Sequence, residues 1–78
     1  MEIAKAFGIV LKKYRTNKGF SQEKLALMCN LDRTYIGLLE RAQRQPSLTT
    51  IFKICKVLEV RPSEFINEIE NIIHQHKK

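Results

Sequence analysis

Three arginines, Arg33, Arg41 and Arg44, lie within residues 31–47, which read LDRTYIGLLERAQRQPS. The planar guanidinium group donates paired hydrogen bonds, which suit the oxygens of a phosphate or the O6 and N7 acceptors of guanine. The sequence offers no nucleophile–base pair, no Gly-rich phosphate loop and no cluster of metal ligands. We therefore expect recognition of a polyanion, with no enzymatic activity, no cofactor and no metal.

The charge of the chain is unevenly distributed. There are 14 Lys and Arg against 8 Asp and Glu, a net charge of +6. Residues 1–45 carry nine basic and four acidic residues, and residues 46–78 carry five and four. This asymmetry indicates a polyanion-binding face and a separate packing or assembly face. The alternative is a basic protein without a particular polyanion, and charge alone does not distinguish the two.

Cys29 and Cys55 each lie inside an apolar run and do not form a CxxC pair. Their spacing fits neither a zinc site nor a disulfide framework, so we expect free, buried thiols in a reducing compartment. The N-terminus has no signal-peptide pattern, and no apolar run reaches membrane-spanning length. These features predict a cytoplasmic protein and a single domain over residues 1–78.

Apolar residues spaced three and four apart predict helices, and no stretch alternates with the two-residue period of a strand. The first helix is expected to end before Gly19, and the second to begin at a Ser21 cap. The residues predicted to face the core from these two helices are Ile3, Phe7, Val10, Leu11, Tyr14, Leu25, Ala26, Met28 and Cys29.

A break at residues 30–32 leads to a third helix over about residues 33–41, which the side chain of Asp32 is expected to cap. Ser47 caps a fourth helix, and Pro62 suits the first turn of a fifth. The predicted fold is therefore all-α, a compact arrangement of five short helices. The core residues predicted from the third and fourth helices are Ile36, Leu39, Leu48, Ile51, Ile54, Cys55 and Leu58.

The second and third helices, joined by a tight turn in a basic domain, form a helix-turn-helix arrangement. The segment RTNKGFSQEKLALMCNLDRTYIGLLERAQRQPSLTTIFKICKVLEV resembles the Cro/repressor-type (XRE) helix-turn-helix domain, over about residues 7–66. It is most similar to the controller proteins of restriction–modification systems. Phage-type repressors and antitoxin-like autoregulators are alternatives within the class. A protein-interaction module that has this fold but binds no DNA is the alternative from another class.

The resemblance implies that the third helix reads bases in the major groove and that its neighbours hold the DNA backbone. Arg33, at the start of this helix, can donate to guanine O6 and N7. The expected base contacts are Arg33, Thr34, Leu38 and Gln22. The expected phosphate contacts are Ser21, Tyr35, Gly37, Arg41, Gln43 and Arg44. For any one of them, a solvated surface residue or a plain helix cap is the alternative.

The resemblance also implies a structural ion pair between Arg15 and Glu40, which would join the first helix to the end of the third. Such a pair is expected to be partly exposed and to contribute little energy.

Gly37 and Leu38 occupy positions where a solvated helix normally carries charge. Glycine in a helix interior destabilises it by about 0.5–1 kcal/mol relative to alanine, so another interaction should compensate. Close approach of the DNA backbone at Gly37 would do so, and Leu38 would contact a thymine methyl group. The alternative is that Leu38 belongs to the core.

The fifth helix, about residues 62–75, carries more apolar surface than a small core needs. We expect it to form a homodimer interface, because two recognition helices about 34 Å apart can read a palindromic operator. The alternative is a monomer whose last helix wraps its own core. Activation, which the resemblance also implies, would add RNA polymerase as a partner. The expected interface residues are Phe65, Ile66, Ile69 and Ile73.

Overall fold

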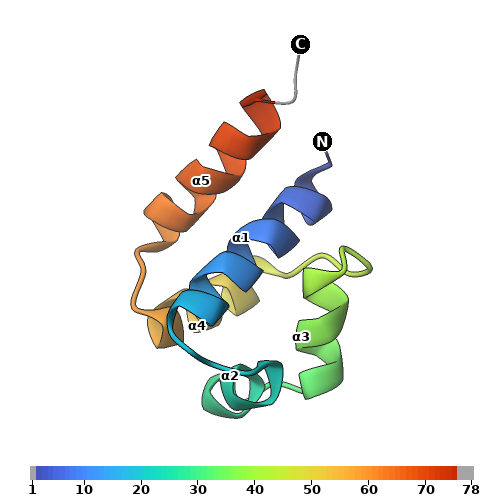
Figure 1. Ribbon diagram of the computed structural model, residues 1–78, viewed down its shortest axis with the longest axis vertical. Helices are drawn as coiled ribbons and strands as arrows, with labels where there is room; N and C mark the ends of the chain where they lie inside the picture. The colour runs from blue at the N-terminus through green and yellow to red at the C-terminus, as the bar shows by residue number, and fades with distance from the viewer. Residues whose placement is uncertain (1, 76–78) are drawn as a thin grey trace.

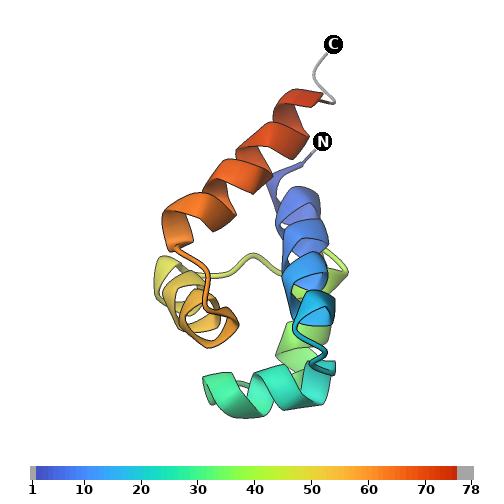
Figure 2. The same cartoon turned by 60° about the vertical axis from the view of Figure 1, so that its left-hand side comes forward.

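The computed structural model describes residues 2–75, which form five helices and no strand (Figure 1). This confirms the all-α prediction, including the start of the fifth helix at Pro62. Helices α2 and α3 are the predicted helix-turn-helix pair, and they lie at the opposite end of the molecule from the last turns of α5 (Figure 2). The helices are α1 (Ile3–Asn17), α2 (Gln22–Cys29), α3 (Arg33–Glu40), α4 (Leu48–Leu58) and α5 (Pro62–Gln75).

Serine side chains cap two of the helices, as predicted. Ser21 Oγ accepts a hydrogen bond from the N–H of Lys24 at 3.0 Å, and Ser47 Oγ accepts one from the N–H of Thr50 at 3.1 Å. The predicted side-chain cap by Asp32 is wrong. Asp32 is the N-cap residue of α3, but its carboxylate accepts no capping hydrogen bond. Asp32 is exposed, so water can satisfy the first N–H groups of α3 instead.

Helices α1 to α4 each end through a residue with left-handed backbone geometry. In every case that residue and the next donate N–H groups to carbonyls of the last turn, as in a Schellman motif. The predicted stop at Gly19 is confirmed, with φ of 75°. Ala42 has φ of 62° without the freedom of glycine, so the end of α3 is strained. The residues with this geometry are Gly19, Asn30, Ala42 and Glu59.

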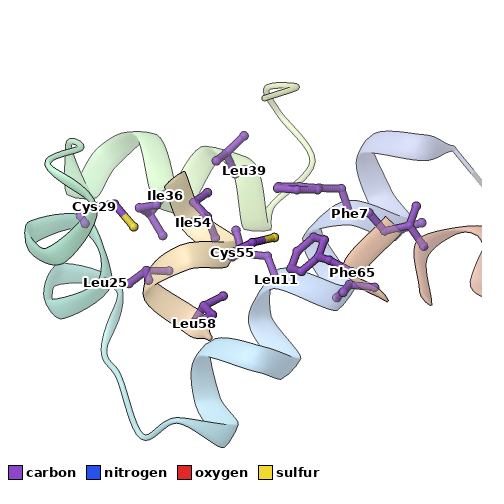
Figure 3. Packing of buried hydrophobic residues seen from close by; sticks show 14 residues of the cluster. Phe7, Leu11, Leu25, Cys29, Ile36, Leu39, Ile54, Cys55, Leu58 and Phe65 are labelled. Atoms are coloured by element: carbon purple, nitrogen blue, oxygen red, sulfur yellow. The ribbon is translucent and has the colours of Figure 1, made fainter. Parts of the chain in front are cut away.

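The core is built around Phe65 of α5, which is fully buried (Figure 3). Its ring centroid lies 5.5 Å from that of Phe7 and 5.6 Å from that of Tyr14, both on α1. Ile69 is only 6% exposed. The prediction that Phe65 forms a dimer interface is therefore wrong, because α5 uses this side chain to close its own core. Ile69 is mostly buried but also lines a groove with Ile66 and Ile73, so its place in an interface stays a prediction. The other large, fully buried side chains are Leu11, Leu25, Ile36, Leu39, Ile54, Leu58, Val10 and Cys55.

Three residues predicted to face the core are exposed instead, namely Ile3, Met28 and Leu48. Ile3 and Leu48 are the first residues of α1 and α4, where no neighbouring helix covers them. Met28 lies beside Leu27, which is also exposed, on the outer side of α2. The cysteines are free and buried, as predicted, and burial raises the pKa of the Cys55 thiol to about 11.

Helix α1 passes very close to the end of α3, and Gly8 makes this possible. A Cβ atom at Gly8 would lie 2.7 Å from the carbonyl oxygen of Glu40 and 2.9 Å from that of Leu39. No real Cβ approaches backbone oxygens so closely, so this crossing requires glycine. Gly8 thus fixes where the C-terminal end of α3 lies, a role that no pattern in the sequence indicated.

A polar contact on the surface joins α1 to α5. The carboxylate of Glu68 accepts hydrogen bonds from Lys13 Nζ at 2.6 Å and from the hydroxyl of Tyr14. The bonds from Lys13 and Tyr14 hold the pKa of Glu68 below its ordinary value. The bond to Glu68, followed by burial, raises the pKa of Tyr14 to about 12. Within residues 2–75, no helix has the length and apolar character needed to cross a membrane.

Candidate nucleic-acid interface

Helix α3 is anchored by one side and exposed on the other. Ile36 and Leu39 are fully buried, whereas Arg33 and Thr34 at its N-terminal end are exposed. Leu38 is half-buried, so it is neither a core residue nor a fully solvated one. This periodicity leaves one face of α3 open beside the start of α2, as a recognition helix requires.

The exposed face contains a small polar hollow between α2 and α3. Its lining brings together predicted base-contacting residues from both helices with two predicted phosphate-contacting residues, Gly37 and Arg41. Guanidinium, hydroxyl and amide groups therefore converge at one place, which is the chemistry that reads base edges. The lining residues are Gln22, Arg33, Thr34, Gly37 and Arg41.

Gly37 is buried although it lines the hollow, so the expected close approach of the DNA backbone at this position stays a prediction. A Cβ atom at this position would lie 3.1 Å from Nη1 of Arg41 and 3.6 Å from Oε1 of Gln22. The side chains of Arg41 and Gln22 therefore cover the glycine. The space that a side chain at Gly37 would occupy belongs to the protein's own polar groups.

The ion pair predicted between Arg15 and Glu40 is present, with Nε of Arg15 2.5 Å from Oε2 of Glu40. A second bond runs from Arg15 Nη2 to Oε1 at 3.1 Å, and Arg15 Nη1 donates to the carbonyl oxygen of Phe20 at 2.7 Å. The side chains are only 11% and 4% exposed, so the expectation of a partly exposed pair is wrong. Removing one partner of a buried pair costs roughly 3–5 kcal/mol, because the other charge is left uncompensated.

Glu40 also orients Gln22. The amide Nε2 of Gln22 donates to Oε1 of Glu40 at 3.0 Å, which turns its carbonyl oxygen toward Gly37 and the hollow. The predicted base-contacting residue thus presents an acceptor, which suits the amino groups of adenine or cytosine. Sequence reasoning missed this bond, because Gln22 and Glu40 become neighbours only through the packing of α1, α2 and α3.

The residues after α3 lie at the edge of this face. Arg41, Gln43 and Arg44 are all exposed, and the N–H of Gln43 donates to the carbonyl oxygen of Leu38 at 2.9 Å. The guanidinium carbon of Arg44 lies 5.6 Å from the ring centroid of half-buried Tyr35, a cation–π contact. This contact therefore joins Arg44, in the loop after α3, to Tyr35 on α3 itself. Ser21 is exposed at the start of α2, where its hydroxyl already caps the helix.

Comparisons with known proteins agree with this geometry. A helix-turn-helix family model matches residues 11–65. Control protein C.BamHI from Bacillus amyloliquefaciens is 45% identical over 62 residues, which cover 78% of this chain and 76% of that protein.

Two solved structures are similar over most of their length. The restriction-modification controller protein C.AhdI from Aeromonas hydrophila has a TM-score of 0.77 and 45% identity, covering 80% of this chain and 94% of that one. The controller protein C.Esp1396I, as a tetramer in complex with its natural 35 base-pair operator, has a TM-score of 0.82 and 37% identity. That similarity covers 91% of this chain and 93% of the other.

Proposed function

We propose that this chain, which belongs to the Cro/repressor-type helix-turn-helix family, is a sequence-specific DNA-binding transcription regulator of the restriction–modification controller type. One observation carries the proposal. The exposed face of α3 meets α2 in a polar hollow that contains Gln22, Arg33 and Arg41. Exposed Arg44, in the loop after α3 and against the ring of Tyr35, would hold the phosphate backbone.

The arrangement favours DNA over the protein-interaction alternative. Docking of a protein partner relies on a desolvated apolar centre, whereas this face presents guanidinium and amide groups. The similarity to C.BamHI and C.AhdI over most of each chain supports the controller type over phage-type repressors and antitoxin-like autoregulators.

Selection of bound sequences from random double-stranded DNA tests the proposal. We expect enrichment of a palindrome whose half-sites are centred about 34 Å apart, one helical turn of DNA. Failure to enrich any sequence at physiological salt would contradict sequence-specific binding. Transcription from the selected operator with bacterial RNA polymerase then distinguishes repression from activation, since only activation requires a contact with the polymerase.

A palindromic operator implies a dimer, which is part of the same proposal. The interface that we propose for it differs from the one predicted from the sequence. Leu48, Phe52 and Ile66 are 68%, 55% and 43% exposed and line one shallow depression between α4 and α5. Ile66 also lines the adjoining groove, with Ile3 and half-buried Ile73. We infer that a second copy covers this continuous apolar surface, with Ile66 near its centre. Ile66, Ile69 and Ile73 remain from the predicted interface, since all three line this groove.

Replacing Ile66 with glutamate should yield a folded monomer, because an unpaired charge at the centre of an apolar interface is costly. Sedimentation equilibrium at micromolar concentration measures this, and circular dichroism checks the fold. The matched control is Ile9→Glu, a change of another exposed isoleucine, on α1 outside both depressions. A wild-type protein that sediments only as a monomer would contradict the proposed dimer.

A further inference from the structure

The guanidinium group of Arg41 lies across α3 over Gly37, one helical turn earlier. Residues four apart share a helix face, so the side chain of Arg41 can turn back along α3 in this way. A Cβ atom at Gly37 would lie 3.1 Å from Nη1 and 3.7 Å from Nη2 of Arg41. A Cβ atom at this position would therefore crowd the guanidinium group, which would have to give way by a few tenths of an ångström, and a longer side chain would displace it further.

Gly37 differs in this respect from Gly8. The atoms that a Cβ at Gly8 would meet belong to the backbone of α3, so Gly8 is needed for packing. Apart from the backbone of α3 itself, the three atoms nearest to a Cβ at Gly37 belong to the side chains of Arg41 and Gln22. Both of these side chains line the polar hollow, together with Arg33 and Thr34. The position of the helix itself thus does not explain why residue 37 is a glycine.

We propose that Gly37 is a positioning residue that sets operator specificity through Arg41. Its missing side chain lets the Arg41 guanidinium group lie in the hollow near Arg33, where it donates to a guanine edge. Without this space, Arg41 would extend outward toward the flanking phosphates. A phosphate contact is the role that the sequence predicted for Arg41. The inference rests on the proposed DNA-binding function and adds a second base-reading arginine to it.

Gly37→Ala separates this role from a structural one. Alanine favours a helix more than glycine, so the variant should unfold about 2–8 °C higher than the wild type. Its affinity for the selected operator should nevertheless fall by about 5- to 150-fold, the range for one lost bidentate base contact. A residue with a purely structural role would not combine higher stability with weaker, altered DNA recognition.

The experiment compares wild type, Gly37→Ala, Arg41→Ala and the double variant in sequence selection and in operator titrations. We expect Gly37→Ala and Arg41→Ala to lose preference at the same operator position. In the Arg41→Ala background, Gly37→Ala should have no further effect on DNA binding. An unchanged preference in Gly37→Ala, or an effect that persists without Arg41, would overturn the proposal.

Arg41→Lys distinguishes the two possible ligands of the guanidinium group. Lysine keeps the charge but loses the planar fork, so it retains a phosphate contact and not a bidentate guanine contact. We expect the Arg41→Lys variant to lose base preference, whereas the salt dependence of its DNA affinity should equal that of the wild type. Retained preference in Arg41→Lys would overturn the base-reading role.

Two further measurements show whether the role of Gly37 or the proposed DNA-binding function is wrong. A wild type that enriches no DNA sequence refutes DNA recognition itself. In the free protein, the NMR resonance of Arg41 Nε–H should move in Gly37→Ala and stay in place in Arg61→Ala, a change of an exposed arginine before α5. An unmoved resonance in Gly37→Ala overturns the positioning role without reference to DNA.

Discussion

Arg33, Arg41 and Arg44 have the same chemistry but different surroundings. Arg33 is exposed at the start of α3 and lines the polar hollow. Arg41 rests on Gly37 in the same hollow, whereas Arg44 lies against the ring of Tyr35. We therefore assign base reading to Arg33 and Arg41 and binding of the DNA backbone to Arg44.

For Arg44→Ala we predict weaker operator binding with an unchanged base preference. A lost phosphate contact releases one fewer counterion, so the slope of log K against log salt should become shallower by about one. Titrations by fluorescence anisotropy at several salt concentrations measure this slope. Arg61→Ala serves as the control and should leave the slope unchanged. A shifted base preference in Arg44→Ala would mean that Arg44 also reads bases.

At the scale of the helices, the predictions that succeeded rest on local signals. Ser21, Ser47 and Pro62 mark helix starts and Gly19 marks a stop, because caps and fixed dihedrals act within one turn. The predictions that failed depend on tertiary contacts. An apolar stripe on α5 does not say whether its own core or a second copy covers it, and Phe65 proved to be in the core. Likewise, Gly37 was expected on the exposed face of the third helix, but the side chain of Arg41 covers it.

Ala42→Gly should stabilise the protein by roughly 0.5–1 kcal/mol, because alanine is strained at the left-handed end of α3 and glycine is not. Thermal unfolding monitored by circular dichroism measures the change. The same substitution within α2, Ala26→Gly, is the matched control and should destabilise by about 1 kcal/mol or more, since residue 26 is helical and buried. Equal signs for the two variants would contradict the role given to the backbone at Ala42.

At the scale of the whole molecule, two separate contacts hold α1 in place. The buried bonds of Arg15 to Glu40 join it to α3, and the bonds of Glu68 to Lys13 and Tyr14 join it to α5. The first contact orients the recognition helix, and the second holds the helix that carries the proposed dimer surface. The burial of these two contacts could not be predicted from the sequence alone, because burial depends on how five helices pack together.

The Glu68 contact predicts an acid-dependent loss of stability. Because the folded state lowers the pKa of Glu68 below its ordinary 4.5, the unfolded chain takes up the proton first as pH falls. The stabilisation is therefore complete above pH 4.5 and is lost as pH decreases through the folded pKa. Chemical unfolding across this range should show a smaller decrease for Glu68→Gln than for wild type. Glu70→Gln, a change of an exposed glutamate on the same helix, should retain the wild-type decrease.

If α3 reads DNA bases through Arg33, the operator affinity of the Arg33→Ala variant should reveal it. We predict a loss of affinity of about 5- to 150-fold for the selected operator, with relaxed preference at one guanine and an unchanged circular dichroism spectrum. Affinity and base preference equal to those of the wild type would contradict the claim.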